Sequence, residues 1–402
     1  MKIGIIREGK NPPDKRVAFS PKQLKAIKEK YGDQLTFQVQ SSPIRSFSDQ
    51  EYLDEGIEVV EDISGSDVLF GVKEVPIPDI IPGKTYFFFS HTIKKQAYNR
   101  GLLQEFLKRN IRMIDYEMLK NEKGARVVAF GRWAGIVGAY NAFLTYGLKS
   151  GLYELKRARD CFDLEELRNE LKKVELPPIK IILTGRGKVG KGAREVLEMI
   201  PIREVSEKAF LNNYFDEPIF TNLDSKEINC RKQDGGFDLN EFYTQPELYE
   251  SNFQKYTEVA DILIGASYWD PNAPRLFELM DIQNPDFAIS VIADITCDID
   301  GSIPTTQRPS TIDSPIYDMD RETLTEIPPF AKQSSISVMA VDNLPCELPR
   351  EASQGFGAQL SEWVIPALFE ENAPILERAT ICRDGDLTLE FMYLQDFLEG
   401  KE

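Results

Sequence analysis

The segment 179–205 constrains the fold more than any other, because it contains a strand, a glycine-rich turn, a helix and a second short strand in immediate succession. Residues 179–183 form a nearly continuous apolar run, which is typical of a strand buried on both faces. The glycines that follow, Gly185, Gly187 and Gly190, have the spacing G-x-G-x-x-G. They permit a tight turn, close approach of a pyrophosphate to the backbone, and close helix-strand packing. Amide groups at the helix N-terminus then face an anion. The segment therefore predicts a dinucleotide-binding βαβ unit.

The second strand of this unit bears on the choice of cofactor. Glu204 lies 19 residues after Gly185, close to the spacing of about 20 residues expected for an acid that binds a ribose 2′-hydroxyl. Arg203 beside it would instead pair with the 2′-phosphate of NADP. Adjacent strand residues point to opposite faces, so only one of the two faces the ribose. The spacing favours Glu204 and NAD, with NADP as the alternative because Lys188 and Lys191 add positive charge to the loop.

The length and the net charge of the chain limit the classes of protein to which it can belong. The chain has 402 residues and a net charge of −17, which predicts two domains, since single cores rarely grow past about 250 to 300 residues. The charge argues against nucleic acid or an anionic membrane as a partner. No apolar run approaches the roughly 18 residues of a membrane span, and Met1 leads directly into a strand. The five cysteines have no metal spacing and are expected to stay reduced, as in the cytoplasm.

Strands and helices alternate along most of the chain, which predicts an α/β fold with two Rossmann-like domains, a cleft between them, and parallel sheets flanked by helices. One domain comprises residues 1–134 and 346–402, has no glycine fingerprint, and is the expected substrate and catalytic domain. The other, residues 135–345, is the expected dinucleotide-binding domain. An apolar stretch at 134–152 predicts a helix, and a helix at 350–369 returns the chain to the first domain. Residues 206–258, rich in polar and aromatic side chains, are interpreted as an irregular insertion.

Two side chains at predicted strand ends are candidates for proton transfer. Lys73 and His91, the only histidine, each follow an apolar strand directly, and ligands bind at the carboxyl ends of strands in open α/β sheets. The alternative is structural: Lys73 reaches solvent and His91 caps a strand. Neighbouring carboxylates at Glu74, Asp115 and Glu117 would tune the proton affinities of such a pair, as acid/base chemistry near neutral pH requires.

Several motifs around these residues resemble one family. DKRVAFSP, GVKEVP, FFSHTIKKQ, RMIDYEML and RVVAFGRWAG resemble lysine-forming saccharopine dehydrogenase, and they are most similar to the lysine-ketoglutarate reductase half of bifunctional aminoadipic semialdehyde synthase. The resemblance continues through TGRGKVGKGA, SYWDPNAPRL, ADITCDIDGSI and VDNLPCELPREAS. The wider superfamily, which includes alanine dehydrogenase and the nucleotide-binding subunit of transhydrogenase, shares the architecture, the RVA-x-[ST]P start, and the lysine and histidine.

The resemblance implies a reversible hydride transfer between a nicotinamide cofactor and saccharopine, formed from lysine and 2-oxoglutarate, and hence a place in lysine metabolism. It implies that Lys73 handles the proton of the amine and imine, and that His91 is the acid/base group for water addition and carbinolamine breakdown. The implied substrate-binding residues are Arg16, Glu74, Lys94, Glu117, Arg126 and Asp342. Together with the glycine fingerprint, the expected cofactor-binding residues are Gly185, Arg186, Gly187, Lys188, Val189, Gly190, Arg203, Glu204, Ser267, Asp342, Asn343 and Leu344.

Two other functions stay open at the level of sequence. An enzyme similar to alanine dehydrogenase would use the same lysine and histidine on a smaller substrate. A nucleotide-binding regulator would keep the fold without turnover. The joint presence of Arg16, Lys73, His91, Lys94 and Arg126 favours the enzyme, because a sensor does not need a proton-handling pair. The expected partners are small molecules, and the sequence does not indicate an oligomeric state.

Overall fold

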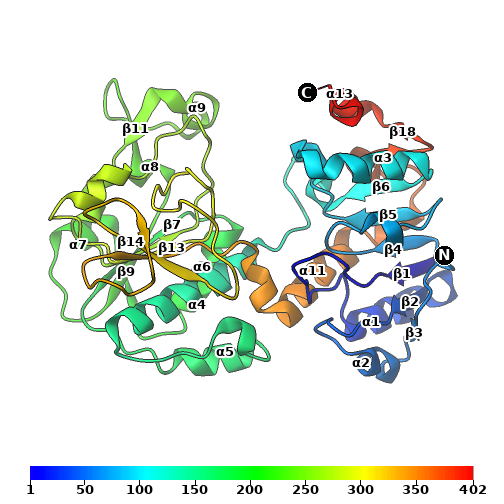
Figure 1. Cartoon of the computed structure of the whole chain (residues 1–402), viewed down its shortest axis with the longest axis horizontal. Coiled ribbons are helices and arrows are strands. Elements are labelled where there is room, and N and C mark those ends of the chain that lie inside the picture. Colours follow the sequence, from blue (N-terminus) through cyan, green and yellow to red (C-terminus); the bar gives the residue numbers. More distant parts are fainter. Residues whose placement is uncertain (402) are drawn as a thin grey trace. The chain divides into compact units, whose positions relative to one another are not determined.

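The computed structural model describes residues 1–401, and the chain divides into two compact units (Figure 1). Unit 1 comprises Met1–Phe130 and Pro349–Glu402, and unit 2 comprises Gly131–Leu348. The sequence placed the divisions a few residues away, after residues 134 and 345. Each unit is a sheet of mainly parallel strands with helices beside it, so the predicted α/β class is confirmed.

Unit 1 contains an eight-stranded sheet in the order β18-β17-β6-β5-β4-β1-β2-β3. The six strands from β6 to β3 are parallel, and the C-terminal strands β17 and β18 pair antiparallel at one edge. The strands are β1 (Lys2–Ile5), β2 (Thr36–Gln40), β3 (Glu58–Val60), β4 (Val68–Phe70), β5 (Thr85–Phe88), β6 (Arg112–Asp115), β17 (Thr380–Arg383) and β18 (Asp386–Leu387). The helices are α1 (Pro21–Tyr31), α2 (Asp49–Asp54), α3 (Arg100–Lys108), α11 (Pro349–Trp363), α12 (Pro374–Ala379) and α13 (Gln395–Glu399).

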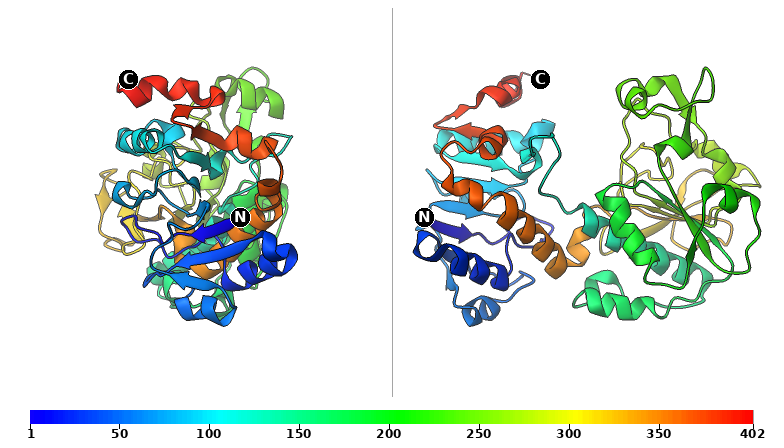
Figure 2. Two further views of the ribbon diagram at one scale, coloured as in Figure 1. Left: turned by 90° about the vertical axis from the view of Figure 1, so that its right-hand side faces the viewer. Right: turned by 180° about the vertical axis from the view of Figure 1, so that it is seen from behind.

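The central strands of unit 1 are aromatic and buried on both faces. The rings of Phe70 and Phe87 stack with centroids 4.5 Å apart across β4 and β5. Helix α11 brings the C-terminal segment back to this unit, as the sequence predicted, because the Ser353 hydroxyl accepts a hydrogen bond from the Val17 amide at 2.9 Å. Figure 2 shows α11 and the C-terminal strands in the same unit as the N-terminal segment, where β17 lies beside β6.

Unit 2 contains a second eight-stranded sheet in the order β15-β14-β16-β13-β12-β7-β9-β8. It is parallel from β16 to β8, while β14 and β15 are antiparallel. The strands are β7 (Lys180–Thr184), β8 (Arg203–Glu204), β9 (Ile219–Leu223), β12 (Ile262–Gly265), β13 (Val291–Asp294), β14 (Ile316–Met319), β15 (Glu326–Ile327) and β16 (Ile336–Met339). The helices of the sheet layers are α4 (Gly131–Ser150), α5 (Leu164–Leu171), α6 (Lys188–Leu197), α7 (Glu207–Asn212), α8 (Ser225–Ile228) and α10 (Gln254–Thr257).

The interpretation of residues 206–258 as an irregular insertion is wrong. This segment contributes β9, which lies directly beside β7 in parallel register, with Ile181 opposite Phe220. Strand β9 has only five residues, and the polar Thr221 and Asn222 interrupt its apolar pattern in the sequence, although Thr221 is buried in the sheet. Only a hairpin made of β10 (Asn229–Arg231), α9 (Leu239–Thr244) and β11 (Tyr249–Ser251) leaves the main sheet.

Close helix packing fixes the start of helix α6. A Cβ atom added at Gly135 of α4 would lie 2.0 Å from the carbonyl oxygen of Val189, and one added at Gly192 of α6 would lie 2.0 Å from that of Arg132. The two helices therefore touch backbone to backbone, and the small residues of the 134–152 stretch make this contact feasible. Among residues 1–401, no helix is long and apolar enough to cross a membrane.

Candidate functional site

Polar side chains gather at one edge of the unit 1 sheet. Strands β6, β5, β4 and β1 are parallel neighbours, so their carboxyl ends lie side by side. The residues that follow these ends are Glu117, His91, Lys73 with Glu74, and Glu8. The structure thus brings together the proton-transfer candidates that the sequence identified separately.

His91 is held by a buried carboxylate. Its Nδ1 atom lies 2.6 Å from Glu74 Oε1, and Lys10 Nζ donates to Glu74 Oε2 at 2.6 Å. Burial acts to raise the pKa of Glu74, but the bonds from His91 and Lys10 outweigh it and lower that pKa to about 2. Glu74 is therefore a carboxylate at neutral pH, and it accepts a hydrogen bond from His91 Nδ1. The His91 backbone adopts a left-handed conformation, with φ of 53°.

Glu8 is a site residue that the sequence reasoning missed. Its two carboxyl oxygens accept hydrogen bonds from the consecutive amides of Val72 and Lys73, at 2.7 and 2.8 Å. Burial, and after it the charge of Asp14, raise the pKa of Glu8 to about 8. Glu8 thereby fixes the backbone that carries Lys73. The rule that found the other candidates, a polar residue after an apolar strand, would have found Glu8 after β1.

Arg16, which was expected to face a substrate carboxylate, lies buried beside Asp14. Arg16 Nη2 and Nε donate to Asp14 Oδ2 and Oδ1 at 2.6 and 3.0 Å, and the guanidinium lies 4.2 Å from the Phe130 ring centroid. Burial acts to raise the pKa of Asp14, but the charge and hydrogen bonds of Arg16 and the charge of Lys73 hold it below its usual range. Lys73 therefore lies near a second buried carboxylate.

The other two expected cations lie on either side of Glu117. Lys94 Nζ is 3.8 Å and Arg126 Nη1 is 3.6 Å from Glu117 Oε1. Both cations are partly exposed, so they are accessible to an anionic ligand. Asp115 has a different role: it is fully buried and accepts hydrogen bonds from the amides of Ser90 and Glu117. Asp115 holds the two loops that carry His91 and Glu117.

The glycine fingerprint of unit 2 has the geometry expected of a phosphate loop. Gly185 has φ of +88°, and an added Cβ would lie 2.7 Å from the carbonyl oxygen of Ala266. A Cβ at Gly190 would lie 2.2 Å from the carbonyl oxygen of Gly185, whereas one at Gly187, the N-cap of α6, would meet nothing within 4 Å. The loop is closed behind Gly185 and Gly190 and open at Gly187, which fits a pyrophosphate against the helix N-terminus.

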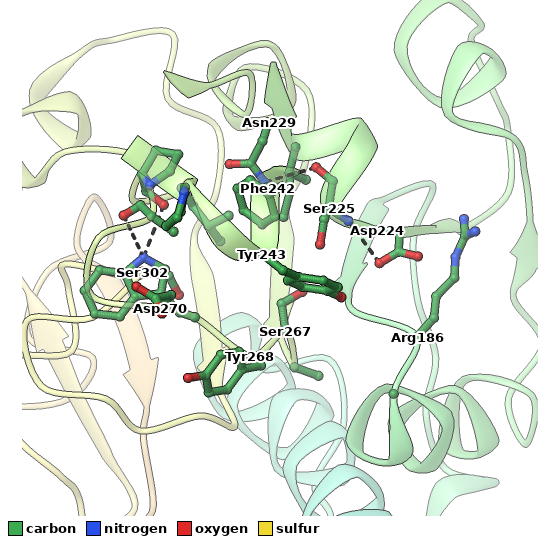
Figure 3. A pocket seen from close by; sticks show the side chains of 18 of the residues that line it. Arg186, Asp224, Ser225, Asn229, Phe242, Tyr243, Ser267, Tyr268, Asp270 and Ser302 are labelled. Carbon is green, nitrogen blue, oxygen red and sulfur yellow. Dashed lines mark hydrogen bonds between the residues drawn. The ribbon is translucent and has the colours of Figure 1, made fainter. Parts of the chain in front are cut away.

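A cavity of about 370 Å³ opens from this loop (Figure 3). Five of the expected cofactor residues line it: Arg186, Gly187, Lys188, Val189 and Ser267. Asp224 and Ser225, at the carboxyl end of β9, line it as well. We call this cavity the dinucleotide groove.

Arg203 and Glu204 do not line this groove. In the sheet, β9 lies between β7 and β8, and β8 is the edge strand. Glu204 lines a second cavity, of about 440 Å³, together with Arg186 of the glycine loop. Arg203 Nη2 pairs with Glu217 Oε1 at 3.0 Å, and Glu204 Oε2 pairs with Arg194 Nη2 at 2.6 Å. The acid at the carboxyl end of the strand next to β7 is Asp224. The spacing in the sequence does not show this strand order, and the cofactor-binding roles of Arg203 and Glu204 stay predictions.

The predicted residues after β16 also lie away from the dinucleotide groove. Asp342 is exposed, and its amide donates to the carbonyl oxygen of Ser310 at 3.3 Å. Asn343 is left-handed, with φ of 63°, and Leu344 is buried. Within the described residues, no group of three or more His, Cys, Asp or Glu side chains could hold a metal ion, and the five cysteines form no disulfide.

Comparisons with known proteins agree with this architecture. Residues 4–137 match the family model of the alanine dehydrogenase/PNT N-terminal domain. Solved structures of an L-alanine dehydrogenase and of a transhydrogenase from Sinorhizobium meliloti share the fold. Their TM-scores are 0.65 and 0.61, their identities are 17% and 15%, and the alignments cover 99% and 96% of this chain and 100% of each solved chain.

Two curated relatives align along nearly all of the chain. Alpha-aminoadipic semialdehyde synthase, mitochondrial, of Mus musculus is 32% identical over 100% of this chain, which spans 48% of that relative. Saccharopine dehydrogenase [NAD(+), L-lysine-forming] of Schizosaccharomyces pombe is 27% identical, with 93% of this chain and 95% of the relative covered. The chain is therefore similar along nearly its whole length to lysine-forming saccharopine dehydrogenases, and it spans about half of the longer semialdehyde synthase relatives.

Proposed function

We propose that the protein is an NAD-dependent, lysine-forming saccharopine dehydrogenase, which interconverts saccharopine with lysine and 2-oxoglutarate. The observation that carries this proposal is the strand-end cluster of unit 1, where Lys73 and the His91–Glu74 pair lie at adjacent strands. Unit 1 is then the substrate and catalytic domain, and unit 2 is the dinucleotide-binding domain.

The bound nicotinamide supplies hydride exchange at the carbon of the substrate C–N bond. The chain supplies the proton transfers. Lys73 takes the proton of the secondary amine as the imine forms, and His91 Nε2 accepts and returns the protons of water addition and carbinolamine breakdown. Glu74 fixes the His91 tautomer, and Glu8 fixes the Lys73 backbone, so both bases keep their positions through the sequence of steps.

Saccharopine has three carboxylates, which need fixed cations in a protein whose net charge is −17. Lys94 and Arg126 are the accessible pair, and Glu117 holds them in place until a substrate carboxylate binds. The planar guanidinium of Arg126 suits a carboxylate. Arg16 contributes its positive charge while it stays paired with Asp14.

NAD is the proposed cofactor, and Asp224 is the acid that would bind its adenosine ribose. A carboxylate at this place accepts hydrogen bonds from the ribose hydroxyls and repels a 2′-phosphate. The S. pombe relative is named as an NAD(+) enzyme. Asp342, Asn343 and Leu344, after β16, remain the predicted residues of the nicotinamide end.

Absorbance of the reduced nicotinamide tests the proposal. The substrates are saccharopine with NAD⁺, lysine plus 2-oxoglutarate with NADH, and alanine with NAD⁺. Turnover is expected with the first two. Turnover of alanine alone would instead indicate an alanine dehydrogenase, which has the same fold. If no substrate is turned over while nucleotide binds, the protein is a regulator.

We further propose that the protein works in the cytoplasm, which the reduced state of the five cysteines supports. The mouse relative is named as mitochondrial. Cell fractionation followed by immunoblotting decides between the two compartments.

A further inference from the structure

The hairpin 229–251 is a small folded body of its own. Strands β10 and β11 pair antiparallel, and Phe237 and Phe242 both pack edge-on against Tyr249, with ring centroids 5.4 and 5.2 Å away. Arg231 Nε donates to Glu241 Oε2 at 2.7 Å, which ties β10 to α9. These contacts hold α9 in a defined orientation without help from the main sheet.

The base of the hairpin is fixed to the walls of the dinucleotide groove. The Ser251 hydroxyl donates to the carbonyl oxygen of Leu276 at 2.6 Å, and the Asn252 amide donates to that of Ile228 at 2.9 Å. Ile228 ends α8, and Leu276 ends the loop after β12. The hairpin therefore bridges the two segments between which the groove opens.

The groove is lined by both polar and apolar side chains. Its polar lining includes the glycine loop, Arg186, Asp224 and Ser267. Its apolar lining comes from the hairpin, from α8 and from the loop after β12, namely Ile228, Phe242, Pro246, Ala273, Pro274 and Leu276. An adenosine diphosphate likewise combines polar phosphates and ribose with a base that presents two apolar faces.

One aromatic ring of the hairpin is exposed at this groove. Tyr243 of α9 is 64% exposed although it lines the groove, and the centroid of its ring lies 6.2 Å from that of Phe242. Figure 3 shows Tyr243 among the labelled side chains that line the groove. The packing of the hairpin itself uses Phe237, Phe242 and Tyr249, so folding does not require Tyr243.

We infer that the hairpin 229–251 is the adenine-binding wall of the groove and that the Tyr243 ring stacks on the base. This inference rests on the proposed dinucleotide binding and extends it to a segment outside the glycine fingerprint. Base–aromatic stacking is sequence-tolerant but strong, about 1–3 kcal/mol per base. The affinity of the protein for the dinucleotide therefore depends on contacts between the hairpin and the adenine half of the cofactor.

The test measures ADP-ribose binding by isothermal titration calorimetry with the full chain. Tyr243→Ala should weaken binding by about 5- to 150-fold, the equivalent of one lost stack, and Tyr243→Phe should retain wild-type affinity because the ring remains. Tyr214→Ala is the matched control: Tyr214 is an exposed tyrosine of the same unit that does not line the groove, and binding should be unchanged. A thermal melt of each variant checks that it is folded.

The outcomes separate this inference from the proposed function. If the wild-type chain does not bind ADP-ribose, the proposed dinucleotide site itself fails. If the wild type binds and Tyr243→Ala binds equally well, the stacking role of Tyr243 is wrong while the proposed function stands. If Tyr268→Ala loses binding and Tyr243→Ala does not, the base stacks on the loop after β12 and the inference is overturned.

Discussion

At the scale of single residues, the proposed proton transfers depend on Lys73 and His91. Lys73→Met and His91→Gln should each lower kcat by about 10²- to 10⁴-fold, the usual effect of losing an acid/base group. ADP-ribose affinity should be unchanged, because neither residue lies in unit 2. Steady-state kinetics with lysine, 2-oxoglutarate and NADH measure the effect. Wild-type rates and an unaltered pH profile in both variants would show that neither residue takes part in the proton transfers.

Glu74 should also contribute to stability in a pH-dependent way. Its pKa is lowered to about 2 in the folded chain from an ordinary value of 4.5. A depressed carboxyl pKa stabilises the fold above about pH 4.5, and this stabilisation is lost as the pH falls from 4.5 towards 2. Urea denaturation between pH 6 and pH 3 should show a shallower acid-induced loss in Glu74→Gln than in wild type. Glu122→Gln, at an exposed position of unit 1, is the control and should follow wild type.

Asp224, at the carboxyl end of β9, should decide the choice between NADH and NADPH. Asp224→Ser removes the carboxylate that binds the ribose hydroxyls and repels a 2′-phosphate, so kcat/KM for NADH should fall and that for NADPH should rise. Glu204→Gln is the matched control, because Glu204 pairs with Arg194 on the edge strand. The ratio of the two specificity constants is the measurement. A ratio that changes in Glu204→Gln and not in Asp224→Ser would show that Glu204, as its sequence spacing predicts, binds the ribose hydroxyls.

At the scale of elements, two substitutions in the turn from β7 into α6 should distinguish a loss of cofactor binding from a loss of folding. Gly190→Ala would place a Cβ 2.2 Å from the carbonyl oxygen of Gly185, so the turn must shift, and both the melting temperature and ADP-ribose binding should fall. Gly187→Ala meets nothing within 4 Å and should fold normally. Its methyl group would still occupy the open face of the loop, so binding alone should weaken. Calorimetry and thermal melts together measure both effects, and normal binding by Gly187→Ala would show that no phosphate approaches there.

At the scale of the whole molecule, two separate cores predict two unfolding steps. One core cluster draws its residues from unit 1 alone and another from unit 2 alone. A ligand that binds one unit stabilises that unit by mass action. Differential scanning calorimetry should therefore show two transitions, of which ADP-ribose raises only one. A single transition that shifts as a whole would mean that the units unfold together.

The amino-acid sequence by itself determined the features that depend on local pattern. Apolar runs predicted the strands, glycine spacing predicted the turn at Gly185, and polar residues directly after strands identified Lys73 and His91. The motifs also led to the family, which the relatives confirm. Each of these signals lies within a few consecutive residues, and secondary structure and turn geometry are set over the same range.

The tertiary structure alone decided which strands are neighbours. Glu204 has the expected spacing from Gly185, but β9 lies between its strand and β7, so Asp224 occupies the place beside the loop. Strand order follows from which apolar faces pack together across the whole unit, and no local spacing contains it. For the same reason the contacts of Glu8 with Val72 and Lys73, and of the hairpin 229–251 with the groove, join segments whose proximity only the folded chain creates.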